Sequence, residues 1–106
     1  MSFKYKESYG NFIGGKFVEP VSGKYFDNVS PVNGKVLCRI ARSDEKDIEL
    51  ALDAAHAAKE AWGATNVAER SLILHKIAQV MEDNLSLLAE AETWDNGKPI
   101  RETTAA

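Results

Sequence analysis

Residues 36–48 read VLCRIARSDEKDI, and the pattern of the chain changes within this stretch. The first six residues form a short apolar run with β-branched side chains, which is typical of a strand. Ser43 or Asp44 then offers a side-chain oxygen to the first amide hydrogens of a helix, and the acids that follow suit the positive end of its dipole. The stretch therefore predicts a β-hairpin region over residues 11–42 and a helical region over residues 43–106.

Glycine and asparagine mark the turns of the β-hairpin region. Gly14-Gly15 lies between two short extended pieces and supplies the positive φ that a tight turn requires. Asn33-Gly34 is the strongest hairpin signal in the chain, and Pro31 keeps Ser30 extended while it removes one backbone donor. We expect three or four short antiparallel strands before residue 43.

The helical region contains three predicted helices. Apolar residues recur every three or four positions from Ile48 to Trp62, and Gly63 is expected to end this first helix. Asn66 with Glu69 forms a plausible capping box for the second helix. The remaining signals are a break at 83–84, a third helix over 85–94, a stop at 95–99 and the start of another helix over 100–106.

The second predicted helix carries more apolar surface than one short sheet can cover. Its apolar arc includes Leu72, Ile73, Ile77 and Val80, and such a wide arc needs more than one packing partner. We therefore expect the 106 residues to be a piece of something larger, and to self-associate or pack poorly when isolated. The fold class predicted for the segment is α+β, with N-terminal antiparallel β-hairpins followed by three helices.

Composition excludes several classes of protein. The 106 residues carry a formal net charge of −3 and are 44% apolar, which is an ordinary globular mix. No apolar run approaches the roughly 20 residues that span a bilayer, and the basic residues are spaced singly rather than clustered for nucleic acid. A single cysteine excludes an internal disulfide. We expect a cytoplasmic protein that binds neither nucleic acid nor membrane.

The residues offer no recognisable active site. Cys38 lies within a predicted strand with Arg39 on the opposite face, so we interpret it as a packed structural thiol. His56 has Asp53 and Glu60 at helical spacing, yet a surface histidine is the simpler interpretation than a metal ligand. His75 is interpreted as a packed or boundary residue. No glycine-rich phosphate loop is present, so we assign no catalytic and no cofactor-binding residue.

Five ordered stretches of the chain nevertheless resemble a known family. The most specific is ETWDNGKP at 92–99, which looks like the E-T-x-x-x-G-K-P segment of the NAD(P)-dependent aldehyde dehydrogenase superfamily. The other four are FIGGKFV at 12–18, VSPVNGKV at 29–36, the alanine-rich helix of 47–62 that ends in Trp, and the R-x-x-x-L-x-x-x-A pattern within 68–78. The similarity is closest to the acetaldehyde-type enzymes.

The resemblance implies that residues 1–106 are the N-terminal part of the coenzyme-binding domain of a longer α/β enzyme with a Rossmann-like fold. Such an enzyme oxidises an aldehyde to an acid: a cysteine attacks the carbonyl, hydride passes to NAD or NADP, and a glutamate-activated water releases the acyl group. Its Gly-Gln and Glu-Leu-Gly-Gly motifs are not in this sequence, and Cys38 does not match the nucleophile. We expect the segment alone to be inactive, and to bind no cofactor, within a homo-oligomeric parent.

The resemblance also implies one ion site. Some members hold a monovalent cation through positions that correspond to the Val29 carbonyl and the Asp95 carboxylate, although Asp95 could instead cap its own turn. Two other hypotheses stay open for the chain as a whole. It could be an independent α+β module that binds a partner through its apolar helical face, or a metal-binding fragment built around His56.

Overall fold

The computed structural model describes residues 3–105. Short strands come first and helices follow, so the predicted α+β class is confirmed, with a short fourth helix where a further helix was expected to begin. The strands are β1 (Ser8–Tyr9), β2 (Asn11–Ile13), β3 (Lys16–Val18), β4 (Tyr25–Val29) and β5 (Val36–Ala41). The helices are α1 (Glu45–Ala64), α2 (Val67–Asp83), α3 (Leu85–Asn96) and α4 (Ile100–Ala105).

The strands form two separate sheets. One is the β2–β3 hairpin, in which Phe12 pairs with Phe17 and the two rings meet edge to face at 5.1 Å. The other has the order β1-β5-β4, with β4 and β5 antiparallel. The antiparallel strands expected before residue 43 are β2 to β5. The sequence did not predict β1, which pairs in parallel with β5 through Ser8 and Arg39. Two residues are too few to carry a periodic signal, so this pairing depends on contacts distant in sequence.

The predicted turns are present. Gly14 and Gly15 connect β2 to β3 with φ angles of 63° and 82°. The connection from β4 to β5 is longer than a two-residue turn, because the Ser30 amide donates to the Lys35 carbonyl and the Gly34 amide donates to the Ser30 carbonyl, both at 2.9 Å. Gly34 has a φ of 67°, which explains the need for glycine there.

Asp47 joins the strand half to the start of α1. Its Oδ2 accepts the amide of the N-cap residue Asp44 at 3.0 Å, and its Oδ1 accepts the amide of Val21 at 2.9 Å. Asp44 in turn accepts the amide of Lys46 at 2.9 Å, which completes a capping box. The Asp47 residue is only 3% exposed. The amide bonds from Asp44 and Val21 lower the pKa of its carboxyl, so the carboxylate is the form that holds this junction.

The other helix boundaries follow local signals with two differences. Gly63 does not end α1, which continues to Ala64 with Thr65 as its C-cap. Asn66 caps α2 by accepting the Glu69 amide at 2.8 Å, but no return bond from the Glu69 side chain is present within residues 3–105. Asn84 separates α2 from α3, as predicted, and Gly97 ends α3 in the left-handed conformation.

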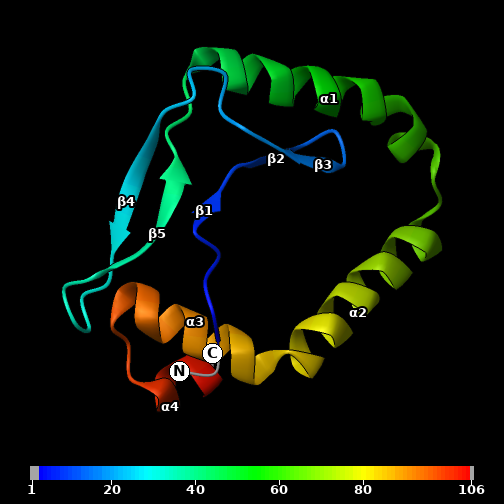
Figure 1. Cartoon of the computed structure of the whole chain (residues 1–106). Coiled ribbons are helices and arrows are strands. Elements are labelled where there is room, and N and C mark those ends of the chain that lie inside the picture. Colours follow the sequence, from blue (N-terminus) through cyan, green and yellow to red (C-terminus); the bar gives the residue numbers. More distant parts are fainter. Residues whose placement is uncertain (1–2, 106) are drawn as a thin grey trace.

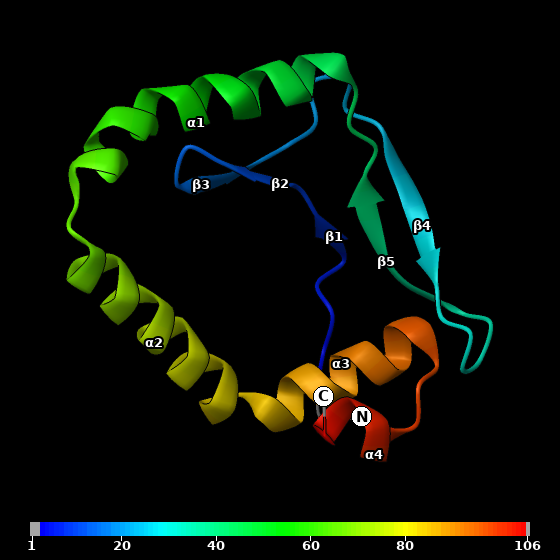
Figure 2. The same ribbon diagram turned by 180° about the vertical axis from the view of Figure 1, so that it is seen from behind.

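The chain has an open shape. Figures 1 and 2 show α1, α2 and α3 following one another around the edge of the molecule, with β1 and the β2–β3 hairpin on the inner side. The radius of gyration is 17.0 Å, whereas a compact domain of about 100 residues has about 13 Å. Within residues 3–105, Cys38 and Ala89 are the only buried apolar residues, and no residue of α2 is buried. The prediction of surplus apolar surface is confirmed.

This open surface predicts how the 106-residue chain behaves alone. We expect it to self-associate or to bind a dye such as anilinonaphthalene sulfonate. Contact between water and the exposed apolar faces of the helices is unfavourable, and association or dye binding reduces that contact. Sedimentation velocity and dye fluorescence over a concentration series measure this. A dye-free monomer that melts in one sharp transition would contradict the prediction and support the independent module.

A second prediction concerns Asp47. The Asp47→Asn variant should exchange the Val21 or Asp44 amide hydrogen faster, because the two amides bond to different carboxylate oxygens and asparagine replaces one of these with an NH2 donor. Leaving one buried amide donor unpaired costs about 1–3 kcal/mol. Hydrogen exchange of the whole chain measures this, with the exposed Asp53→Asn as the control on the same helix.

The Asp47 effect has a defined pH dependence. Its folded pKa is lowered, so the stabilisation is present above the ordinary carboxyl pKa and is lost as pH falls through the folded value. If the Val21 and Asp44 amides are both as well protected from hydrogen exchange in Asp47→Asn as in the unmodified chain, the bonds to Asp47 do not hold the junction.

Candidate functional site

The β4–β5 hairpin lies against the last turns of α3 (Figures 1 and 2). Side chains from the strand half bond to helix carbonyls there. Ser30 is fully buried, and its Oγ donates to the Trp94 carbonyl and accepts the Val32 amide. The Tyr5 hydroxyl donates to the Ala91 carbonyl. These bonds hold the C-terminal half of α3 in a set position relative to the hairpin.

Asn28 contributes a further polar side chain to this junction. Its Nδ2 donates to Asp95 Oδ1 at 2.7 Å, so the amide is aimed at the end of α3. Cys38 lies beside it on β5 and is buried. Burial raises the pKa of the Cys38 thiol, a hydrogen bond with Asn28 lowers it in part, and the Asp95 charge raises it further. A raised pKa keeps the thiol protonated and weakly nucleophilic at neutral pH, which agrees with the structural thiol that the sequence predicts.

The two residues implied as cation ligands belong to the same junction. Val29 is the last residue of β4 and adjoins Asn28, whose side chain is bonded to Asp95. The Asp95 side chain is exposed, and no hydrogen bond to its Oδ2 is present within residues 3–105. The alternative that Asp95 caps its own turn is wrong: Asn96 does so, because its Oδ1 accepts the Lys98 amide at 2.9 Å.

The two histidines lie elsewhere. His56 is exposed on α1, as expected, and His75 is exposed on α2, so the interpretation of His75 as a packed or boundary residue is wrong. The reason is that α2 buries none of its residues against the rest of the described chain. Among residues 3–105, no group of three or more His, Cys, Asp or Glu side chains could hold a metal ion.

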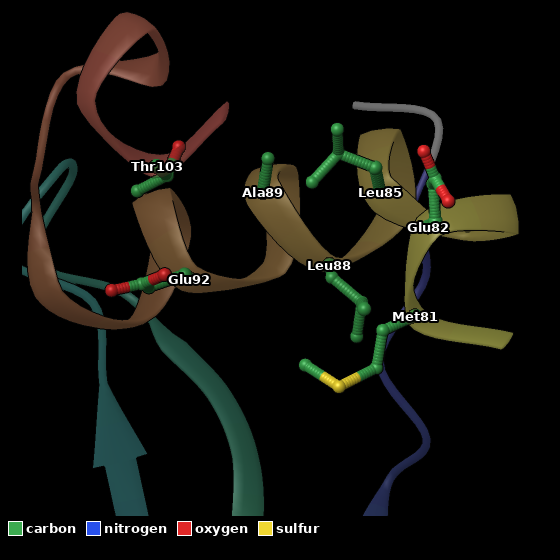
Figure 3. Close-up of a pocket in the computed structure, with 7 residues that line it drawn as sticks. All are labelled: Met81, Glu82, Leu85, Leu88, Ala89, Glu92 and Thr103. Atoms are coloured by element: carbon green, nitrogen blue, oxygen red, sulfur yellow. The ribbon is translucent and has the colours of Figure 1, made fainter. Parts of the chain in front are cut away.

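A groove of about 430 Å³ lies where α2, α3 and α4 meet. Figure 3 shows Met81 and Leu88 side by side on one side of the α3 ribbon, with Leu85 and Ala89 on the other. Glu92 at its edge pairs with Lys98 at 3.3 Å, and the Thr103 hydroxyl bonds with Thr93. The sequence did not indicate this groove, because its residues come from three helices: Met81, Glu82, Leu85, Leu88, Ala89, Glu92 and Thr103.

The family model for the aldehyde dehydrogenase family matches residues 17–106. The chain belongs to the aldehyde dehydrogenase family. An aldehyde dehydrogenase of Paracoccus denitrificans is 67% identical over 102 residues, covering 96% of this chain and 20% of the relative. Aldehyde dehydrogenase B of Escherichia coli is 59% identical over 103 residues, covering 97% and 20%. A long-chain-aldehyde dehydrogenase of an Acinetobacter species is 62% identical over 102 residues, covering 96% and 20%.

Solved structures give the same family and fold. A 3,6-anhydro-L-galactose dehydrogenase in complex with NAP matches with a TM-score of 0.90 at 31% identity, covering 92% of this chain and 20% of that one. PnpE in complex with nicotinamide adenine dinucleotide matches with a TM-score of 0.89 at 38% identity, covering 91% and 20%. The chain therefore spans about a fifth of the length of the aldehyde dehydrogenases it matches. No helix within residues 3–105 is long and apolar enough to cross a bilayer.

Proposed function

We propose that this chain is the N-terminal part, residues 1–106, of the coenzyme-binding domain of an NAD(P)-dependent aldehyde dehydrogenase. The observation that carries the proposal is the 67% identity to an aldehyde dehydrogenase over a fifth of that enzyme's length. In it, residues 11–42 form the hairpin region and residues 43–106 the helical frame. An independent interaction module is not favoured, because the matching relatives are much longer aldehyde dehydrogenases.

In this proposal the whole enzyme oxidises an aldehyde to a carboxylic acid. NAD or NADP, when bound, supplies the hydride acceptor. The chain contributes no nucleophile, because Cys38 is buried within the hairpin junction and its raised pKa keeps the thiol protonated. Its own residues instead fix the positions of the helices. Ser30 and Tyr5 donate hydrogen bonds to carbonyls of α3, and Asp47 accepts the Val21 amide at the start of α1. The chain is thus a frame on which the other parts of the enzyme are arranged.

The finer properties of the enzyme belong to the same proposal. We propose a cytoplasmic homo-oligomer whose small-molecule partner is an aldehyde, with acetaldehyde suggested by the sequence resemblance alone. A relative named for long-chain aldehydes is 62% identical to the chain, so the proposed substrate class is kept at aldehydes in general.

A chimera tests the proposed function. The 106 residues replace the matching fifth of the Paracoccus denitrificans enzyme, and reduction of NAD and NADP is followed with short and long aldehydes. We expect the chimera to be active, because the replaced segment is 67% identical, and the 106-residue chain alone to be inactive. A folded chimera without activity, or turnover by the isolated chain, would contradict the proposal.

The Cys38→Ser chimera is the matched control for the nucleophile. It should keep the kcat of the unmodified chimera, because this thiol lies in the hairpin junction and forms no covalent adduct with the aldehyde. Peptide mapping by mass spectrometry after incubation with aldehyde checks the adduct directly.

We further propose that the Val29 carbonyl and the Asp95 carboxylate contribute ligands to a monovalent cation. Oxygen ligands suit such a hard ion, and Asp95 Oδ2 is free of hydrogen bonds within residues 3–105. Asp95 accepts a hydrogen bond from the Asn28 side chain, and Val29 is the next residue of the chain after Asn28, which supports a shared location. The remaining ligands would come from outside the described residues or from water.

The cation site predicts a salt effect that depends on Asp95. Adding potassium or sodium chloride to the chimera in a choline chloride background should raise its melting temperature, because the folded state binds the ion. The Asp95→Asn variant should lose most of this rise, whereas the exposed Asp53→Asn control should keep it. An equal rise in both variants would show that Asp95 is not a ligand.

A further inference from the structure

Arg70 lies on an exposed apolar face of α2. In a helix of 3.6 residues per turn, residues three, four and seven positions apart share one face. Within α2 these neighbours of Arg70 are all large and apolar, and each is between 43% and 72% exposed: Val67, Ile73, Leu74 and Ile77. Before the helix, the positions on this side are the N-cap residue Asn66 and Gly63. The guanidinium therefore lies at the N-terminal end of an apolar face.

Arg70 has no partner in the described chain. Positions 66, 67, 73 and 74 are the ones that could pair with it along the helix, and none of them is acidic. No ion pair or hydrogen bond involves its side chain within residues 3–105, although the residue is partly buried. The other charged residues of α2 lie away from this face: Glu69, Lys76, Glu82 and Asp83.

The apolar face of α2 continues into the groove at the end of the helix. Met81 lies four positions after Ile77 and also lines the groove, where Leu88 lies beside it and extends the apolar surface onto α3 (Figure 3). A surface of this extent is covered in a folded protein. Covering it with apolar groups alone would bury the charge of Arg70 without compensation, which is strongly unfavourable. A carboxylate on the covering surface would compensate this charge most fully.

We propose that the α2 face around Arg70 docks against another part of the same enzyme chain, an apolar surface that carries one carboxylate paired with Arg70. The proposal rests on the proposed function, because it takes the occupant from the four-fifths of the matching enzymes that this chain does not span. A guanidinium and a carboxylate can form two parallel hydrogen bonds, which would set the register of the two surfaces. Arg70 is thus a positioning residue for the assembled domain.

Substitutions in the chimera test the pair. The Arg70→Met variant keeps the apolar length of the side chain but leaves the partner carboxylate buried and unpaired. We expect its thermal inactivation to be about tenfold faster than that of the unmodified chimera, since loss of one partner of a buried pair exceeds the roughly 1.4 kcal/mol that corresponds to tenfold. Lys76→Met, about 120° around the same helix from Arg70, is the matched control and should change the rate little.

The pH dependence separates an ion pair from simple packing. An unpaired buried carboxylate has a raised pKa, so it takes up a proton and loses its charge as pH falls. The penalty of Arg70→Met should therefore shrink when inactivation is measured at about pH 6 instead of about pH 8. If Arg70 served only to cover apolar surface, methionine would replace it without loss at either pH, and that result would overturn the pair.

Crosslinking identifies the occupant. Ile77→p-benzoylphenylalanine in the chimera places a photoreactive group on the docking face, and His75→p-benzoylphenylalanine places one on the side away from it. We expect Ile77 to crosslink within one chain, to a peptide downstream of the replaced segment, so that the denatured product keeps the mass of a single chain. A product of doubled mass would assign the face to a second subunit and overturn the proposal, as would a pattern identical to that of His75.

The failures of the two proposals are distinguishable. An unmodified chimera that folds without activity contradicts the proposed function. An active chimera in which Arg70→Met behaves like Lys76→Met contradicts the docking pair alone.

Discussion

The hydrogen bond from the buried Ser30 hydroxyl to the Trp94 carbonyl joins the strand half of the chain to the C-terminal part of α3. Residues of the strand half lie on one side of this bond and the last turns of α3 on the other. Asn28 and Tyr5 reinforce it by bonding to Asp95 and to the Ala91 carbonyl. Because these contacts are polar and directional, they set the position of α3 more narrowly than apolar packing alone would.

The hydrogen bonds of Asp47 form a second junction, at the start of α1. Between these two junctions the helices form an open frame. Neither α1 nor α2 closes over an apolar core, and α2 buries no residue at all. Hydrophobic burial is the main stabilising contribution in folded domains, so an arrangement with two buried apolar residues within residues 3–105 is incomplete as a stability unit. In the proposed function, the exposed faces are surfaces for assembly with the rest of the enzyme.

The chemistry of the chain is consistent with a framework role. Its one thiol is buried in the hairpin, where burial raises its pKa, and its histidines lie on exposed helix surfaces without a cluster of ligands in the described residues. Charged groups act instead as connectors. Asp47 accepts amides from two segments, and Arg70, which has no ion-pair partner among residues 3–105, lies on the apolar face that we assign to docking.

Local signals in the sequence determined most of the elements. Gly14-Gly15, Asn66 and Gly97 mark turns and helix ends because positive φ and amide capping are requirements of single residues and their near neighbours. The ordered motifs also determined the family, and the strand position of Cys38 indicated its burial. Only the tertiary structure decided the parallel pairing of β1 with β5, the bond from Val21 to Asp47, the pairing of Asn28 with Asp95 and the groove beside α3. These features join residues far apart in the chain, and no local preference of either partner encodes the other, so the spatial arrangement of the whole frame was needed to reveal them.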